Sequence, residues 1–423
     1  MTEMSQLEKW VPELRSRFPA LSRQLNGQEV AYLDGPAGTQ VPQSVIDAIV
    51  HYLQHSNANR HGSFVTAEET EQLFSELQQA YAAFLGISDP GELVFGANMT
   101  TLTFAMSRAL AQTWDEGDEI VLTRLDHDAN VSPWRLAAED KNVTVKWVGF
   151  DAATGRLDLE ELKSQLSENT RLVAVGAASN ATGGINPLAT IAEMAHEVGA
   201  LCYVDAVHLG PHRLMDTNAW DADFVVCSAY KFFGPHVGIL WGQRELLEDL
   251  AAYKVRPASN TIPEKWMTGT QNHECLAGAL ACVHYLAEIG TMVGATAEDP
   301  LREKLRMAFQ AIEAYECQLS LEFLDGLNKL GGFDVYGITD PDSFSQRCST
   351  FSIRHSEVKA KDLAYELGSR GIFTWAGNYY ALEYSEQMNL EPDGMLRIGF
   401  VHYNTRQEVR RVLEALADAV NGE

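Results

Sequence analysis

The sequence predicts an α/β protein: a large domain built on a mostly parallel central sheet, with a smaller α+β domain after it. From about residue 93 to residue 241, short apolar runs alternate with helical patterns, which is typical of parallel strands covered by helices. After about residue 245 this rhythm becomes irregular, and a charge-alternating tail follows two helical stretches. We therefore expect an N-terminal arm over residues 1–25 that packs with the small domain, a large domain over 26–294, and a small α+β domain over 295–423.

Seven apolar runs make up the predicted large sheet, in chain order ELVF, EIVLT, VTVKWVGF, RLVAVGAASN, LCYVD, DFVVCS and GILWG. Three of them contain continuous apolar stretches, LVAV, LCYV and FVVC, as expected for strands buried on both faces. These three should lie at the centre of the sheet. Between the fourth and fifth runs, Pro187 precedes the helical pattern LATIAEMAHEVG, and Gly199 stands at the usual stop position.

The second half of the chain predicts a different arrangement. A helix rich in small residues, CLAGALACVHYLAEIG, is followed by a long helix from about residue 299 to residue 330. The tail then carries three expected strands, CSTFSIRH, GIFTWAG and MLRIGFVHY. We assign the long helix and these strands to the small domain.

Composition excludes several classes of protein. The 423 residues suffice for two to three domains, and 46% hydrophobic with 21% charged residues is typical of an ordinary folded chain. The formal net charge of −26 opposes binding to nucleic acids and anionic membranes. The six cysteines show no short paired spacing, so we expect no metal site and reduced thiols in a cytoplasmic protein. Neither a signal peptide nor an apolar run of 18 residues is present, and we expect no membrane span.

Polar residues at the ends of the predicted strands are the candidates for a functional site, because ligands gather beyond the carboxyl ends of parallel strands. ELVF leads into GANMTTLTFAMSRAL, where Met99 and Thr100 begin a helix whose free N–H groups suit a phosphate; threonines there also serve as ordinary caps. EIVLT is followed by His127, although a lone histidine is more often structural. Asn180 stands in a glycine-rich turn, which can equally be turn chemistry.

Two further strand ends complete the set. Asp205 closes LCYVD, where a buried carboxylate requires a cationic partner. Ser228, Tyr230 and Lys231 follow FVVC, and the aromatic residues around Lys231 argue against a surface lysine. A lysine amine for a Schiff base, a carboxylate for a pyridinium nitrogen and a helix start for a phosphate are together the needs of pyridoxal 5′-phosphate (PLP). Burial would lower the lysine pKa and favour the reactive amine.

Motifs along most of the chain resemble those of a known family. They are YLDGPAGTQVPQSVIDAI, NANRHGSFVT, LDHDANVSPW, AASNATGGINPL, YVDAVHLGPH, CSAYKFFGPHVGILWG, TGTQNHE and MLRIGFVHYNT. The family is the class V aminotransferases of PLP fold type I, and within it the group II branch that resembles cysteine desulfurases and selenocysteine lyases. The aspartate and SAYK motifs are the most specific part of the resemblance.

The resemblance implies roles for individual residues. Lys231 would be the Schiff-base lysine, Asp205 the partner of the pyridinium nitrogen and His127 the residue stacked on the ring. Thr100 with the neighbouring amides, Ser228 and Tyr230 would hold the phosphate, and Thr270 would come from the other subunit of a homodimer. Asn180 and Arg397 would meet the substrate carboxylate, for which a guanidinium is well shaped.

This chain departs from the family at three positions. Where desulfurases of the branch carry a nucleophilic cysteine, the segment WAGNYYA places Tyr380, and a phenol cannot replace the thiolate that forms a persulfide. His208 stands where the family usually has glutamine near the phenolic oxygen of PLP. Tyr230 stands where it usually has histidine. Both side chains still donate hydrogen bonds, so cofactor binding should survive.

The predicted function is therefore that of a homodimeric PLP enzyme acting at Cα of a small amino acid through Lys231. Transamination and C–S lyase chemistry are favoured over persulfide formation because of Tyr380. The alternatives are a true cysteine desulfurase or selenocysteine lyase, an amino-acid epimerase, and a non-catalytic scaffold that keeps the fold. Trp375, Tyr379 and Tyr380 would shape an apolar substrate pocket, or else pack beneath the small domain.

Overall fold

The large sheet of the predicted α/β fold is present in the computed structural model, which describes residues 6–422. Its strand order is β4-β10-β9-β8-β7-β5-β6. Strands β5 to β9 run parallel, whereas β10 is antiparallel to both of its neighbours. The seven predicted runs supply all seven strands, with bounds β4 Leu93–Gly96, β5 Glu119–Thr123, β6 Thr144–Val148, β7 Thr170–Gly176, β8 Leu201–Asp205, β9 Phe224–Ser228 and β10 Gly238–Gly242.

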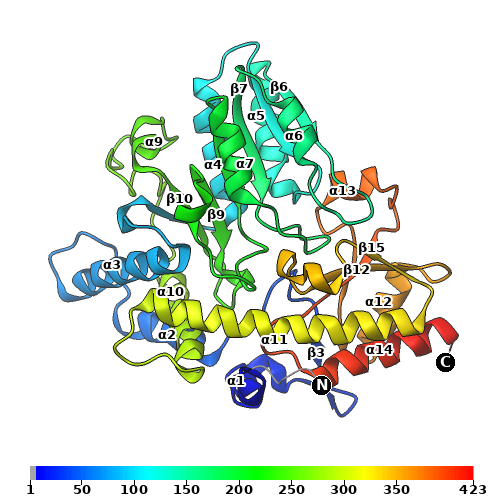
Figure 1. The fold of residues 1–423 in the computed structure, drawn as a ribbon. Coiled ribbons are helices and arrows are strands. Elements are labelled where there is room, and N and C mark those ends of the chain that lie inside the picture. The colour runs from blue at the N-terminus through cyan, green and yellow to red at the C-terminus, as the bar shows by residue number, and fades with distance from the viewer. Residues whose placement is uncertain (1–5, 423) are drawn as a thin grey trace.

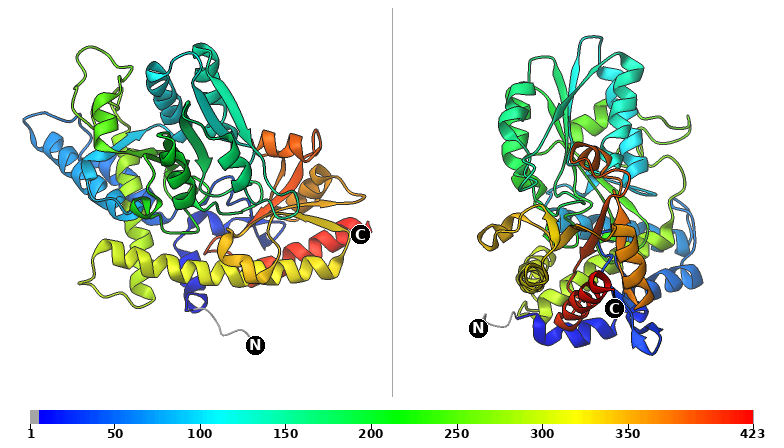
Figure 2. Two further views of the ribbon diagram at one scale, coloured as in Figure 1. Left: turned by 45° about the horizontal axis from the view of Figure 1, so that its top comes forward. Right: turned by 90° about the vertical axis from the view of Figure 1, so that its right-hand side faces the viewer.

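The three continuously apolar strands, β9, β8 and β7, occupy the third to fifth positions of the seven, as predicted. Helices cover both faces of this sheet (Figure 2), so residues of a central strand are buried whichever way they point. Val173, Val204 and Val226 accordingly have no exposed surface. The α-helices are α1 Val11–Ser16, α2 Gln43–His55, α3 Val65–Leu85, α4 Met99–Leu110, α5 Ser132–Lys141, α6 Leu159–Gln165, α7 Leu188–Glu197, α8 Thr217–Trp220, α9 Arg244–Asp249, α10 His273–Met292, α11 Leu301–Leu330, α12 Ala360–Ser369, α13 Leu382–Gln387 and α14 Arg406–Asn421.

A second sheet lies beside the lower end of the large one (Figure 1). Its order is β11-β12-β15-β14, with every neighbouring pair antiparallel. Helix α11 runs beneath both sheets and packs against α10 and α14. The arm reaches the same region, because Arg15 pairs with Glu408 of α14 at 3.0 Å. The strand bounds are β11 Phe333–Tyr336, β12 Thr350–His355, β14 Trp375–Gly377 and β15 Met395–Gly399; the domain limits at 25/26 and 294/295 stay predictions.

The segment GIFTWAG forms two strands rather than the one we predicted. Its first part, β13 (Ile372–Phe373), pairs in parallel with β3 (Ala31–Tyr32), whereas β14 pairs with β15. Thr374 separates the two parts and lets the chain pass from one sheet to the other. A further pair, β1 (Gln24–Leu25) and β2 (Gln28–Glu29), forms a small hairpin in the arm. These pairings join distant segments, so local periodicity could not reveal them.

Helix α10 is the one helix among residues 6–422 that is long and apolar enough to cross a membrane. The apolar window of this helix is 61% buried inside the protein, where it packs against α2, α3 and α11. Packing between neighbouring helices therefore accounts for its apolar composition.

The start of α4 is fixed by two contacts that matter for the site. The Asn98 side chain accepts a hydrogen bond from the Thr101 amide at 2.9 Å, which caps the helix. The Met99 amide donates to Ser228 Oγ at the end of β9, also at 2.9 Å. Gly238 makes this approach possible, because a Cβ there would lie 2.4 Å from the Asn98 carbonyl carbon.

Candidate active site

A cavity of about 540 Å³ opens beyond the carboxyl ends of the central parallel strands, the position that parallel sheets offer to ligands. Its size lies within the range of ordinary small-molecule sites. Nine of the predicted site residues line it, namely Met99, Thr100, His127, Asn180, Asp205, His208, Ser228, Tyr230 and Lys231. Residues as far apart in the chain as Met99 and Lys231, 132 positions, are therefore brought to one place.

Lys231 is held in the cavity wall by a short 3₁₀ turn, Ala229–Lys231, that follows β9. Its ammonium group donates to the carbonyl oxygen of Pro36. Burial lowers the pKa of Lys231 to about 7, and the nearby charge of Arg397 acts in the same direction. A large fraction of this lysine is thus a neutral, nucleophilic amine near neutral pH.

Asp205 ends β8 and lies in the wall of the same cavity. One of its oxygens accepts from the Val207 amide at 2.9 Å. Burial raises the pKa of Asp205 to about 6, an effect that the Val207 hydrogen bond and the charge of Lys231 oppose. The carboxylate has no salt bridge of its own among the described residues, so a cationic ligand group would stabilise it.

The α4 end of the cavity is suited to an anion. Met99 and Thr100 present the first turn of a 12-residue helix to the cavity, where amide groups and the helix dipole favour negative charge. Ser228 Oγ accepts from the Met99 amide, which leaves its own proton free to donate. Tyr230 lies at this wall as well, with its ring stacked on His236 at 5.0 Å.

His127 is a neutral imidazole whose ring is fixed on two sides. Its Nδ1 accepts from the Ala129 amide at 3.0 Å, and burial lowers the pKa of His127 to about 3. The Tyr380 ring stacks against it, with 5.3 Å between ring centroids and 24° between planes. Asp128 strengthens this contact, because its amide donates to the Tyr380 carbonyl at 2.7 Å.

Asn180 and Arg397 are in direct contact, although they are 217 positions apart. Arg397 donates to the Asn180 carbonyl at 3.0 Å and lies 4.3 Å over the Tyr379 ring. The Asn180 amide nitrogen donates to the Tyr379 carbonyl, whereas its Oδ1 is buried without a partner. This buried polar atom, in the cavity wall, calls for a hydrogen-bond donor from a ligand.

Four predicted site residues do not line this cavity: Trp375, Tyr380, Arg397 and Thr270. Trp375 pairs in register with Arg397 across β14 and β15, but its side chain is 52% exposed. Tyr380 reaches the site only through His127, and Thr270 is exposed on its own subunit. Their roles stay predictions.

Two carboxyl groups at the site, the buried Asp126 and the half-buried Asp34, were not predicted. Asp126 lines the cavity and accepts from the Gly176 amide and from Asn130; burial raises its pKa to about 7. Asp34 lies near Lys231 and Arg397, and burial raises its pKa to about 6. Both stand inside motifs that carried the resemblance, Asp34 in YLDGPAGTQ and Asp126 directly before His127, and these motifs were the available signal.

The groups around the cavity fit PLP. Lys231 offers an amine, Asp205 an unpaired carboxylate for a ring nitrogen, the α4 start an anion site, and Asn180 an unpaired acceptor. On a mostly parallel sheet with a second antiparallel sheet beside it, such a site defines the class of enzymes called PLP fold type I.

The comparisons with known proteins agree with this class. The aminotransferase class-V family profile matches residues 31–412. A probable cysteine desulfurase from Vibrio cholerae is 31% identical over 96% of this chain and 98% of its own, and an aminotransferase-like protein from Gibberella zeae is 30% identical over 96% and 97%. The fold matches that of a cysteine desulfurase from Thermococcus onnurineus with a TM-score of 0.85, at 23% identity over 97% and 98% of the two chains.

The chain belongs to the aminotransferase class-V family. It is a PLP-dependent enzyme of the cysteine desulfurase-like group. Both the predicted family and the predicted fold class are thereby confirmed.

Proposed function

We propose that this enzyme binds PLP at Lys231 and acts at Cα of a small amino acid by transamination or C–S lyase chemistry, without a protein persulfide. The observation that carries this proposal is the absence of a thiol at the site. None of the six cysteines lines the cavity, and Tyr380 occupies the loop position against His127.

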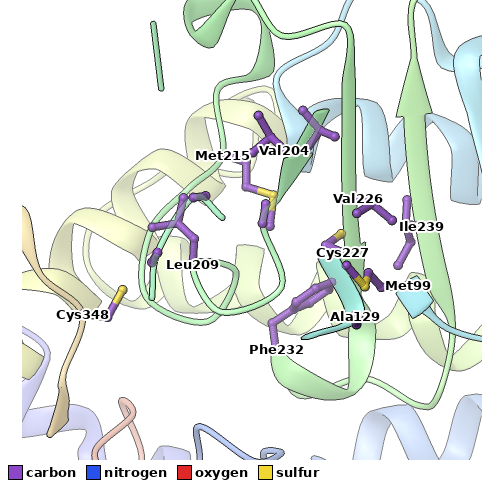
Figure 3. Close-up of a cluster of buried hydrophobic side chains, with 14 of the residues drawn as sticks. Met99, Ala129, Val204, Leu209, Met215, Val226, Cys227, Phe232, Ile239 and Cys348 are labelled. Atoms are coloured by element: carbon purple, nitrogen blue, oxygen red, sulfur yellow. The ribbon is translucent and has the colours of Figure 1, made fainter. Parts of the chain in front are cut away.

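Cys227, which directly precedes the cavity residue Ser228, cannot act as a nucleophile. Cys227 lies on β9 in an apolar cluster with Met99, Ile239 and Phe232 (Figure 3). Burial raises its pKa well above that of a free thiol. A protonated, fully buried thiol neither meets a substrate nor attacks its sulfur.

Bound PLP supplies an electron sink that weakens the bonds at the substrate Cα. Asp205 would face the ring nitrogen and hold its positive charge. The α4 amides, Thr100, Ser228 and Tyr230 would hold the phosphate, and neutral His127 would cover one face of the ring. With its pKa near 7, the Lys231 amine is suited to accept a proton from Cα and return it.

The substrate carboxylate is assigned to Arg397 and to the second N–H of the Asn180 side-chain amide, whose first N–H goes to the Tyr379 carbonyl. Arg397 is buried and keeps part of its donor capacity free beyond the bond to the Asn180 carbonyl. Trp375 and Tyr380, both largely exposed, would contact the substrate side chain from the rim, which favours an apolar group.

The proposed assembly is a cytoplasmic homodimer in which Thr270 completes the partner's phosphate site. Thr270 is absent from the cavity of its own chain. Tyr253 and Val255, in the segment that leads to it, are 66% and 68% exposed; a second copy would cover them. All six cysteines are free thiols, as in reducing compartments.

The test is the visible spectrum of the purified protein during addition of cysteine, alanine and aromatic amino acids, with product analysis. We expect a yellow PLP band that is absent in Lys231→Ala. Bleaching to pyridoxamine phosphate with formation of a keto acid identifies transamination. Sulfide with pyruvate from cysteine identifies a C–S lyase.

The second candidate is a true cysteine desulfurase, which the names of the relatives favour. Stoichiometric alanine and persulfide from cysteine would establish it and overturn our proposal. Inversion at Cα without net conversion would instead show an epimerase. A colourless protein that does not take up PLP would leave only the scaffold alternative.

A further inference from the structure

A cluster of His208, His212 and Cys348 lies where the turn after β8 meets the chain just before β12. His208 also lines the large cavity, whereas no role given above uses His212 or Cys348. One nitrogen from each histidine and the cysteine sulfur all lie within 4.8 Å of one another. His208 is 5% exposed, His212 1% and Cys348 not at all. Thiol and imidazole side chains in such a group are the common ligands of zinc.

The two histidines reach one place because of a turn after β8. Gly210 donates its amide to the Ala206 carbonyl at 3.1 Å, and Arg213 donates to Leu209, so the segment is wound as in a helix. Residues four apart on such a turn share one side, and the two imidazole rings lie 5.6 Å apart.

Cys348 comes from the other side, just before β12. Its amide donates to the Gly183 carbonyl at 2.7 Å, which fixes the backbone there. Its side chain lies beside the turn that carries Leu209 (Figure 3). The cluster therefore joins a loop of the large sheet to a strand of the second sheet.

The free imidazole nitrogens point to a ligand. Nε2 of His208 and Nε2 of His212 are both buried with no hydrogen-bond partner, whereas buried polar atoms are normally paired. His212 Nδ1 donates to Glu316 of α11 at 2.6 Å. In the tautomer that makes this bond, the proton is on Nδ1 and the lone pair on Nε2 is free to bind a metal. At zinc sites, a metal-binding histidine commonly donates its other N–H to a carboxylate in this way.

Charge supports the same interpretation. Glu316 is 2% exposed. The nearby cations are engaged elsewhere, since Arg347 donates to backbone carbonyls and Arg213 pairs with Glu313. A divalent cation bound to one thiolate and backed by one carboxylate would bring the charge of the cluster to zero.

We propose that His208, His212 and Cys348 bind one zinc ion, with a water as the fourth ligand. Binding converts the Cys348 thiol to a thiolate and releases its proton to solvent. Zinc–ligand bonds of about 2.0–2.3 Å require the ligand atoms to approach to roughly 3.5 Å, which small side-chain rotations achieve. The site would fasten the two sheets together and fix His208 at the wall of the large cavity; its test does not depend on the proposed reaction.

The experiment uses tag-free protein treated with a chelator and then titrated with Co²⁺ as a spectroscopic substitute for zinc. We expect one cobalt per chain, with the visible bands of a tetrahedral ion and a thiolate-to-cobalt band. Cys348→Ser should lose the thiolate band, and Cys202→Ser, which removes an equally buried thiol elsewhere, should retain it. The tetrahedral bands lie to the red of PLP absorption, so the cofactor does not obscure them.

A second variant protects the test against misfolding of Cys348→Ser. Glu316→Gln keeps all three ligands, and we expect the same spectrum with about 10- to 100-fold weaker zinc binding. Three results would each overturn the assignment. They are the absence of the cobalt bands in folded wild-type protein, a thiolate-to-cobalt band that persists in folded Cys348→Ser, and unchanged zinc affinity in Glu316→Gln.

Discussion

The ionisation of Lys231 is the residue-level property on which the proposed chemistry depends. Burial and Arg397 lower its pKa to about 7, whereas Asp205 and Asp34 raise it. Below this pKa the amine is protonated and cannot attack the PLP aldehyde. Above it, the reactive form predominates.

We therefore expect the rate of PLP uptake by the cofactor-free protein to rise with pH and level off above about 7, measured by stopped-flow absorption. Arg397→Gln should move the midpoint to higher pH, because it removes a charge that lowers the pKa of Lys231. Asp34→Asn should move it lower. A midpoint near the ordinary lysine value in the wild type, or shifts of the same sign in both variants, would contradict this assignment.

Tyr380 acts on the site through the His127 ring. An exposed stacked pair contributes about 0.5 kcal/mol beyond area burial, so Tyr380→Ala should weaken PLP binding roughly twofold in equilibrium dialysis. Tyr380→Phe keeps the ring and should bind as the wild type does. Equal loss in both variants would show that the hydroxyl, not the stacking, matters.

At the scale of elements, the close approach of α4 to β10 determines where the phosphate site lies. Gly238→Ala would push a methyl group against the Asn98 backbone. Such overpacking costs about 1–3 kcal/mol, and we expect a corresponding fall in the free energy of unfolding in urea, together with weaker PLP binding. Gly238 is thus required by packing rather than by its backbone angles.

Gly368→Ala is the matched control, because nothing lies within 4 Å of the added Cβ in α12. Alanine is the better helix former by up to about 1 kcal/mol, so this variant should be as stable as the wild type or more so. If Gly238→Ala were equally harmless, the tight contact between α4 and β10 would not exist in solution.

At the scale of the whole molecule, the proposed dimer predicts complementation between two defective chains. Lys231→Ala lacks the amine that binds PLP in its own site. Thr270→Ala lacks the side chain that completes the phosphate site of its partner. If Thr270 acts across the interface, a mixed dimer contains one intact site and one doubly defective site. Equal mixing after reversible dissociation should therefore restore tight PLP binding at about one quarter of all sites, given a twofold symmetric dimer.

Retained PLP after desalting is the measurement, with sedimentation to confirm the mixed dimer. The control is a single chain that carries both Lys231→Ala and Thr270→Ala, because a dimer of such chains contains no intact site. No gain in tightly bound PLP on mixing would place Thr270 in the site of its own subunit or outside it.

The sequence by itself determined the large sheet and the residues at the strand ends. Strands β7, β8 and β9 are continuously apolar because they are buried on both faces. The end of such a strand is visible in its own few residues, so Asp205 and Lys231 could be identified from the local sequence. Composition and spacing also determined that no short cysteine motif exists.

Only the tertiary structure decided which distant residues meet. Arg397 against Asn180, Tyr380 against His127, and the group of His208, His212 and Cys348 are brought together by the packing of one sheet on another. The division of GIFTWAG between two sheets has the same origin. Such contacts depend on the path of the whole chain. No local pattern of hydrophobicity encodes them, because the secondary structure of each segment forms in the same way whether or not its distant partner is present.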